Sequence, residues 1–280
     1  MAAPLAPSSA PDHSDQVPFS DSRLSSYLYP TAATIVLFVV WELATRFGNL
    51  SPLILPAPSR ILATTIDQFP VLLHMSIVTA SEFLLGFGLG VAIGLPLGAL
   101  IVYARPVEMT IYPLLVAFQT IPKAALAPVL IVWLGTGITS KVLIAFAISF
   151  FPIVIDTIIG LRSAQPETIY LVRSMGANPA QIFWHVRFPN ALPAIFGGLK
   201  VASTLAVIGA IVGEFVSSDQ GLGYLLLVAN GELNTRLVFA CVLVLTVLGI
   251  TFYFIIEAFE KLFVRWHVSA RDAEATASGK

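Results

Sequence analysis

Charged residues are scarce in this chain of 280 residues. Asp, Glu, Lys and Arg together make up 11% of the chain, whereas hydrophobic residues make up 57%. Because soluble domains carry about 25% charged residues, this composition argues against an ordinary soluble domain and favours a protein embedded in membrane lipid. The formal net charge is −1. Without an excess of basic residues, no nucleic acid is expected as a partner.

Several chemical motifs are also lacking. Cys241 is the single cysteine, which excludes an intrachain disulfide and disfavours a metal site. The four histidines are scattered, and neither H-E-x-x-H nor G-x-S-x-G occurs. These absences argue against a membrane-embedded enzyme, so we expect no catalytic residue, metal or cofactor in this chain. The phosphate-binding pattern G-x-x-x-x-G-K-[ST] is missing too, so any ATP-driven activity requires a separate ATPase subunit.

The N-terminal region lacks the features of a secretory signal. Residues 1–26 are rich in Pro, Ala, Ser and Asp, and Arg23 is their only basic residue. A signal peptide begins with positive charge followed by an apolar core. We therefore expect residues 1–26 to be a disordered tail that is retained, and residues 266–280 to be a second, C-terminal tail.

Long uncharged runs are present instead. Residues 83–104 and 237–256 each contain no charged residue, and each is long enough for a helix to cross the hydrocarbon of a bilayer. Weaker apolar runs occur at 27–43, 111–134, 142–161 and 194–216. The sequence thus predicts an all-α polytopic membrane protein, with about six transmembrane helices within residues 27–265.

The distribution of basic residues predicts the orientation. Lys and Arg concentrate on the cytoplasmic side of bacterial membranes. With the N-terminus inside, the cytoplasmic segments contain Arg23, Arg105, Arg162, Arg173, Arg187, Lys200, Lys261, Arg265, Arg271 and Lys280, and the outer segments contain only Arg46, Arg60, Lys141 and Arg236. We therefore expect both termini, and the loop between the fourth and fifth spans, to be cytoplasmic.

Small residues recur at helical spacing in two of the spans. The second span carries Gly86, Gly90, Gly94 and Gly98, and the fifth carries Gly198, Ala202, Ala206 and Ala210. A helix face without side chains lets another helix approach closely. The contact is either ordinary packing within one chain, or a subunit interface or moving contact.

Five ionisable residues fall within the spans: Glu42, Glu82, Lys123, Asp156 and Glu214. Charge is costly in lipid, so each should face protein, water or a partner. Glu82, Lys123 and Glu214 lie deepest and are candidates for lining a solute pathway. The alternative is that they form structural pairs or cap broken helices. Lys123 follows Pro122, which places it at a predicted helix break.

A polar segment interrupts the apolar pattern between the fourth and fifth spans. Its apolar spacing predicts two short helices, 166–175 and 179–187, joined by a tight turn at Gly176. Asn178 and Gln181 have the spacing of a capping box, and Pro189 is expected to end the second helix.

The helical pair has three possible interpretations. A DNA-binding helix-turn-helix is disfavoured because the unit is tethered between two spans and carries few basic residues. A purely structural loop is possible. The favoured interpretation is a docking element whose exposed aromatic and amphipathic surface (Tyr170, Phe183 and Trp184) inserts into a partner's groove.

This segment, 163–190, resembles the coupling loop of permease subunits of ABC importers. That loop reads E-A-A, three residues, Gly, nine residues, Ile, one residue, Leu-Pro. Gly176 holds the glycine place, Val186 the isoleucine place and Phe188-Pro189 the Leu-Pro place. The triplet falls on Tyr170-Leu171-Val172, so the acidic residue and any salt bridge through it are absent. The resemblance implies that this loop contacts an ATPase through Tyr170, Arg173, Gly176, Ala177, Phe183, Val186, Phe188 and Pro189.

The resemblance extends over residues 50 to 265. The similarity is to the subfamily that imports nitrate, sulfonates, taurine, thiamine pyrimidine precursors or riboflavin. Four stretches carry it: LPAPSRI, FQTIPKAALAPVLIVWLGTG, FFPIVIDTIIGLRS and IGAIVGEFVSSDQGLGYLL. The stretch PKAALAP and the Glu82 of TASEFLLGF resemble the pyrimidine and riboflavin members of this subfamily more than the sulfonate members.

The resemblance implies a complex in the bacterial inner membrane. It would contain two permease copies as a homodimer, two ATPase copies that use ATP and Mg, and an extracytoplasmic solute-binding protein. ATP-driven closure of the ATPase pair would move the spans and alternate access to the pathway between the permeases. The alternative is a secondary transporter driven by an ion gradient, which usually shows an inverted repeat; no convincing repeat occurs here.

Overall fold

The computed structural model describes residues 23–48, 51 and 53–264. Most of the two predicted tails (1–22 and 266–280) therefore lies outside the described residues. The helices are α1 (Arg23–Phe47), α2 (Pro58–Asp67), α3 (Phe69–Tyr103), α4 (Arg105–Thr120), η1 (Lys123–Leu126), α5 (Ala127–Leu134), α6 (Ile138–Arg162), α7 (Pro166–Ser174), α8 (Pro179–Ile182), η2 (Phe183–Arg187), α9 (Phe188–Ser217), α10 (Leu222–Gly231) and α11 (Thr235–Phe263). Within this part of the chain no strand is present, which confirms the predicted all-α fold.

The chain divides into two units, residues 1–50 and 51–280. The first unit contains α1, which begins at Arg23, within the stretch assigned to the tail. Residues Leu28–Phe47 of α1 are long and apolar enough to cross a membrane. Glu42, one of the ionisable residues in the predicted spans, forms an ion pair with Arg46 one turn later, with 2.6 Å between Oε1 and Nε.

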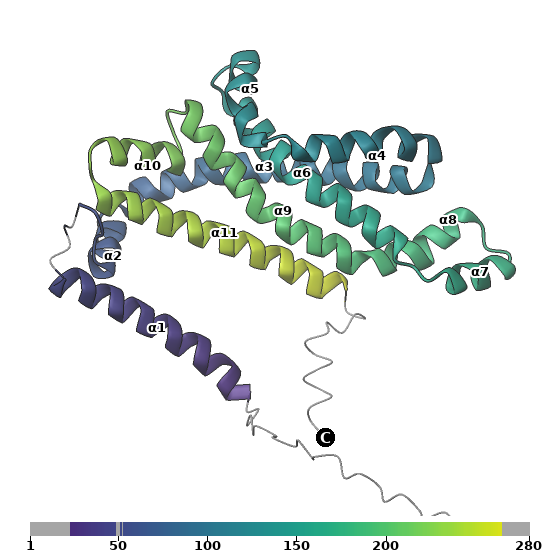
Figure 1. The fold of residues 1–280 in the computed structure, drawn as a ribbon, viewed down its shortest axis with the longest axis horizontal. Helices are drawn as coiled ribbons and strands as arrows, with labels where there is room; N and C mark the ends of the chain where they lie inside the picture. The colour runs from purple at the N-terminus through teal and green to yellow at the C-terminus, as the bar shows by residue number, and fades with distance from the viewer. Residues whose placement is uncertain (1–22, 49–50, 52, 265–280) are drawn as a thin grey trace, which may run out of the picture. The chain divides into compact units, whose positions relative to one another are not determined.

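The second unit holds the other spans (Figure 1). Four helical stretches are long and apolar enough to cross: Phe69–Tyr103, Ile138–Arg162, Pro179–Ser217 and Thr235–Phe263. Helix α4 and the segment Lys123–Leu134 form a further apolar pair, bent by 89° at their junction. Among the described residues the candidate spans therefore number five, or six when the bent pair counts as one, which agrees with the predicted number of about six. The bend confirms the predicted break beside Lys123.

Helix α3 begins earlier than its apolar run suggests. The uncharged run starts at residue 83, whereas α3 starts at Phe69. Glu82 interrupts the run in the sequence, yet its side chain is buried at 1% exposure against a lysine of another helix. A charged residue therefore does not mark the end of this helix, because a partner elsewhere in the fold satisfies it.

Small residues let α3, α6 and α9 pack closely. A Cβ built on Gly86 would lie 2.6 Å from the Ala145 Cβ, and one on Gly98 would lie 2.8 Å from the Thr157 Cβ, both on α6. A Cβ on Gly209 of α9 would also lie close to this helix, 2.6 Å from the Ala145 Cα. The glycine stripe of α3 is thus buried against α6, as expected for packing within one chain.

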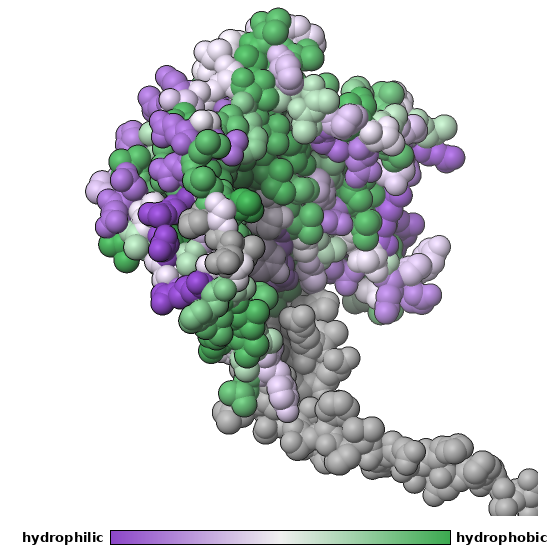
Figure 2. All heavy atoms as spheres, turned by 60° about the vertical axis from the view of Figure 1, so that its left-hand side comes forward, coloured by the Kyte–Doolittle hydropathy of each residue, from purple (hydrophilic) through white to green (hydrophobic). Residues whose placement is uncertain are grey.

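Helix α11 lies beside α9 and covers part of α3 (Figure 1). Phe252 of α11 packs its ring against Phe83 and Phe87 of α3, with centroids 5.1 and 5.0 Å apart. The outer faces of the helices remain apolar, with many exposed hydrophobic side chains, and Figure 2 shows them over much of one face. Such a surface suits contact with lipid.

Candidate functional site

Helices α7 and α8 form the predicted hairpin around Gly176. Gly176 has φ +88°, and two hydrogen bonds close the end of α7: the Gly176 N–H donates to the Arg173 carbonyl and the Ala177 N–H to the Val172 carbonyl. This pattern is a Schellman motif, in which glycine takes the left-handed position. The predicted turn is confirmed.

The start of the second hairpin helix is also confirmed. The Asn178 Oδ1 accepts from the Gln181 N–H, and the Gln181 Oε1 accepts from the Asn178 N–H, each at 2.9 Å. Both bonds of a capping box are therefore present. They fix the direction in which the chain leaves the glycine turn.

The expectation that Pro189 ends the second helix is wrong. Helix α8 continues through a π-helical turn, η2, directly into α9, where Pro189 occupies the first turn. The Phe188 N–H donates to the Phe183 carbonyl, five residues back. Proline is tolerated in a first turn because the missing N–H has no partner there, and the wide π turn precedes it. The hairpin is thus continuous with a membrane span.

An aromatic cluster anchors the hairpin to the end of α3. The Phe183 ring lies edge-on to Tyr103 of α3, with centroids 5.4 Å apart, and also contacts the rings of Trp184 and Phe188. The Arg187 guanidinium lies over the Tyr103 ring at 5.5 Å. These contacts connect the hairpin to the ends of both α3 and α9.

The hairpin exposes an apolar surface. Tyr170, Leu171, Met175 and Trp184 are 61–78% exposed, and α7 contains no buried residue. The predicted exposure holds for Tyr170 and Trp184 but is wrong for Phe183, which is half-buried in the aromatic cluster. Figure 1 shows α7 and α8 projecting from the end of the helical unit. A cavity of about 500 Å³ lies at their base, beside Ser163, His185 and Asn190.

The other predicted coupling residues differ in their exposure. Arg173 and Gly176 are exposed, whereas Ala177, Val186, Phe188 and Pro189 are partly buried. The structure therefore brings all eight residues into one projecting element, but only some of them can be touched from outside. Their contact with an ATPase stays a prediction.

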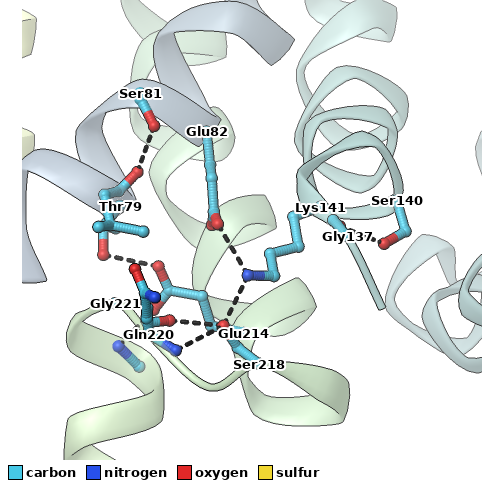
Figure 3. Close-up of polar contacts among 12 residues, drawn as sticks. Thr79, Ser81, Glu82, Gly137, Ser140, Lys141, Glu214, Ser218, Gln220 and Gly221 are labelled. Atoms are coloured by element: carbon cyan, nitrogen blue, oxygen red, sulfur yellow. Dashed lines mark hydrogen bonds and ion pairs between the residues drawn. The ribbon is translucent and has the colours of Figure 1, made fainter. Parts of the chain in front are cut away.

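The candidate pathway residues fall into two places. Glu82 and Glu214 are each 1% exposed and lie between α3, α6 and α9 (Figure 3). Glu82 Oε1 is 3.0 Å from the Lys141 Nζ of α6, and Glu214 accepts hydrogen bonds from Thr79 Oγ1 and the Gly223 N–H. This geometry matches the alternative that these residues form structural pairs or cap helices.

Lys141 is a buried partner of Glu82 that is not among the candidate pathway residues predicted from the sequence. From the sequence it is counted in the outer segments, whereas the structure places it inside α6 with 5% exposure. Lys141 lies beside the two glutamates because α6 packs against α3 and α9. This pairing of helices cannot be read from the sequence. The only sequence feature that indicates the burial of Lys141 is the position of a single lysine at the start of an apolar run.

Lys123 lies apart from this cluster. It is partly buried at the start of η1, where its Nζ donates to the Gln119 carbonyl at 3.1 Å and lies 4.6 Å from the centre of the Phe151 ring. It thus meets an aromatic ring of α6 in the described part of the fold. That Glu82, Lys123 and Glu214 line a solute pathway stays a prediction.

Comparisons with known proteins agree with this architecture. Residues 88–265 match the family described as the binding-protein-dependent transport system inner membrane component. The chain is 37% identical to the formylaminopyrimidine transport permease of Halalkalibacterium halodurans, over 85% of this chain and 96% of that protein. It is also 37% identical to the riboflavin transport system permease of Chloroflexus aurantiacus, over 84% and 88%.

A solved structure supports the fold. A chain of the MetNI methionine ABC transporter, in an inward-facing conformation, superposes with a TM-score of 0.61 at 22% identity, covering 70% of this chain and 98% of that one. With the match over residues 88–265, the chain belongs to the family of inner membrane components of binding-protein-dependent, ABC-type transport systems.

Proposed function

We propose that this chain is the permease subunit of an ATP-driven importer of a small organic solute, and that α7 and α8 form its docking element for a cytoplasmic ATPase subunit. The observation that carries the proposal is the projecting hairpin, which exposes the large apolar side chains of Leu171, Met175 and Trp184 in a chain of this family. An exposed patch of large apolar side chains outside the spans marks an interaction site.

The hairpin has the properties that such docking requires. Gly176 and the capping box hold its two short helices at a fixed angle, and the η2 turn joins it to α9 without a flexible linker. Movement imposed on the hairpin would therefore pass to a span. Because Tyr170 occupies the position of the family's acidic residue, docking would depend on shape and apolar contact rather than on a charge there.

The proposed complex contains two copies of this chain, two ATPase subunits that bind ATP and Mg, and an extracytoplasmic solute-binding protein. In this arrangement both termini and the hairpin face the cytoplasm. The distribution of basic residues supports the orientation, and the family's description supports the binding protein. In this proposal hydrolysis takes place in the ATPase subunits, and the role of this chain is movement.

For the solute we propose a heteroaromatic compound of the pyrimidine or flavin type. The names of two relatives, each 37% identical to this chain, support this class. The taurine transport permease of Escherichia coli is 26% identical. A sulfonate or nitrate is therefore the second candidate.

Replacing Met175 tests the docking element. Met175 is 78% exposed at the tip of α7, so M175D should change no internal packing. We expect M175D to weaken co-purification of the ATPase subunit by about ten-fold or more, because a carboxylate must be desolvated in an apolar contact. The matched variant M175L preserves volume and apolarity and should bind normally. Equal ATPase recovery with M175D and M175L would contradict docking through this surface.

A further inference from the structure

A buried polar cluster joins four helices near the start of α10. It consists of Thr79 and Glu82 from α3, Lys141 from α6, Glu214 and Ser218 at the end of α9, and the Gly221–Gly223 backbone, and is called the Glu82–Glu214 cluster below. Figure 3 shows the side chains of Glu82, Lys141 and Glu214 meeting between these helices. Glu82 and Glu214 are each 1% exposed and Lys141 is 5% exposed.

The charges of the cluster do not balance. Lys141 and Glu214 are the charged groups that act on Glu82, and Asp219 in the adjoining loop is exposed. Two carboxylates and one ammonium leave one negative charge in a buried site within the spans. An uncompensated buried charge is costly, and a carboxyl group in that position takes up a proton instead.

Glu214 is the carboxyl whose surroundings favour the ionised form. Its Oε1 accepts from the Thr79 Oγ1 at 2.6 Å, and its Oε2 accepts from the Gly223 N–H at the N-terminus of α10. Hydrogen bonds to both oxygens and a helix N-terminus favour the anion. A Cβ on Gly223 would lie 2.7 Å from Glu214 Oε2, so the backbone is fitted closely around this carboxylate.

Glu82 is the carboxyl with one oxygen that accepts no hydrogen bond from the described residues. Its Oε1 lies 3.0 Å from the Lys141 Nζ, whereas its Oε2 is buried and has no hydrogen-bond partner among the described residues. The Lys141 Nζ also donates to the Ser218 Oγ at 2.6 Å. A proton on Glu82 Oε2 would leave Lys141 and Glu214 as a balanced pair of opposite charges.

We propose that the Glu82–Glu214 cluster is a proton-binding site in which Glu82 carries the proton and Glu214 stays ionised. The bound proton keeps the cluster neutral, and the neutral cluster holds the start of α10 against α3. The Leu222 N–H donates to the Thr79 Oγ1 at 2.9 Å, so Thr79 connects Glu214 directly to α10. This site is independent of ATPase docking, which takes place at the hairpin.

Infrared difference spectra of the purified full-length chain test the proposal. We expect wild type minus E82Q to contain the carbonyl band of a protonated carboxylic acid, because glutamine replaces the protonated carboxyl without changing its shape. Wild type minus E260Q is the matched control: Glu260 of α11 pairs with Lys200 at 2.6 Å and is partly exposed, so it should contribute no such band. A band absent for E82Q, or present for E214Q instead, would overturn the proposal.

Thermal unfolding from neutral to alkaline pH gives a second readout. Loss of the proton from wild-type Glu82 leaves a buried charge, so its Tm should fall with rising pH more steeply than that of E82Q. E214Q should lower Tm at neutral pH by about 3–8 °C, because Thr79 and the Gly223 N–H donate to different oxygens of Glu214, and an amide has an acceptor at only one of these two positions. Parallel pH profiles for wild type and E82Q would contradict a proton on Glu82.

Discussion

Replacing Gly176 with valine is expected to uncouple ATP hydrolysis from transport while the chain still inserts and folds. Gly176 has φ +88°, and its added side chain would meet no atom within 4 Å. The effect is therefore conformational rather than steric. A β-branched residue in the left-handed region costs about 1–2 kcal/mol or more, so the Schellman turn opens and the angle between α7 and α8 changes.

The measurement is solute uptake beside ATP hydrolysis in the reconstituted complex. We expect G176V to lose most uptake and to retain hydrolysis that no longer responds to solute. G176N is the matched control, since asparagine tolerates the left-handed conformation, and it should recover much of the uptake. Normal uptake by G176V, or equal loss in G176N and G176V, would show that the positive φ is not what coupling requires.

Replacing Gly86 with valine is expected to disrupt the packing of α3 on α6. A Cβ at Gly86 would lie 2.6 Å from the Ala145 Cβ and 2.8 Å from the Val142 carbonyl oxygen. The backbone of α6 cannot move aside without breaking its contact with Gly209 of α9. Overpacking of this kind costs about 1–3 kcal/mol, and clashes with backbone should place G86V at the upper end.

Gly88 provides the control for this variant. It lies two residues along the same helix, and a Cβ there would meet no atom within 4 Å. G88V carries the same change in helix propensity without the clash. Thermal unfolding of both variants in detergent should give a Tm several degrees lower for G86V than for G88V. Equal values would contradict the close approach of α3 and α6.

The sequence is sufficient to predict the features that depend on local chemistry. Apolar runs locate the spans, and glycine, asparagine and glutamine at fixed spacing locate the hairpin turn and its capping box. The break before Lys123 follows from Pro122 in the same way. Each of these features arises within a few residues of the chain, so no knowledge of the tertiary fold is required.

Features that depend on tertiary packing escape sequence analysis. The burial of Lys141 depends on α6 lying between α3 and α9, which no local pattern encodes. Phe183 has the same local character as Trp184, yet one is packed against Tyr103 of α3 and the other is exposed. The same limit explains Pro189: its usual role as a helix terminator changes because a π turn leads into the first turn of α9.

The central claim is that this chain belongs to an ATP-driven importer. Measuring which energy source drives uptake tests it most directly. The full complex, with its ATPase and binding protein, is reconstituted in proteoliposomes, and uptake of the solute that co-purifies with the binding protein is measured. The account predicts uptake that requires ATP on the hairpin side and is unchanged by ionophores. Uptake that persists without ATP and collapses with an ionophore would contradict it and favour an ion-gradient-driven transporter.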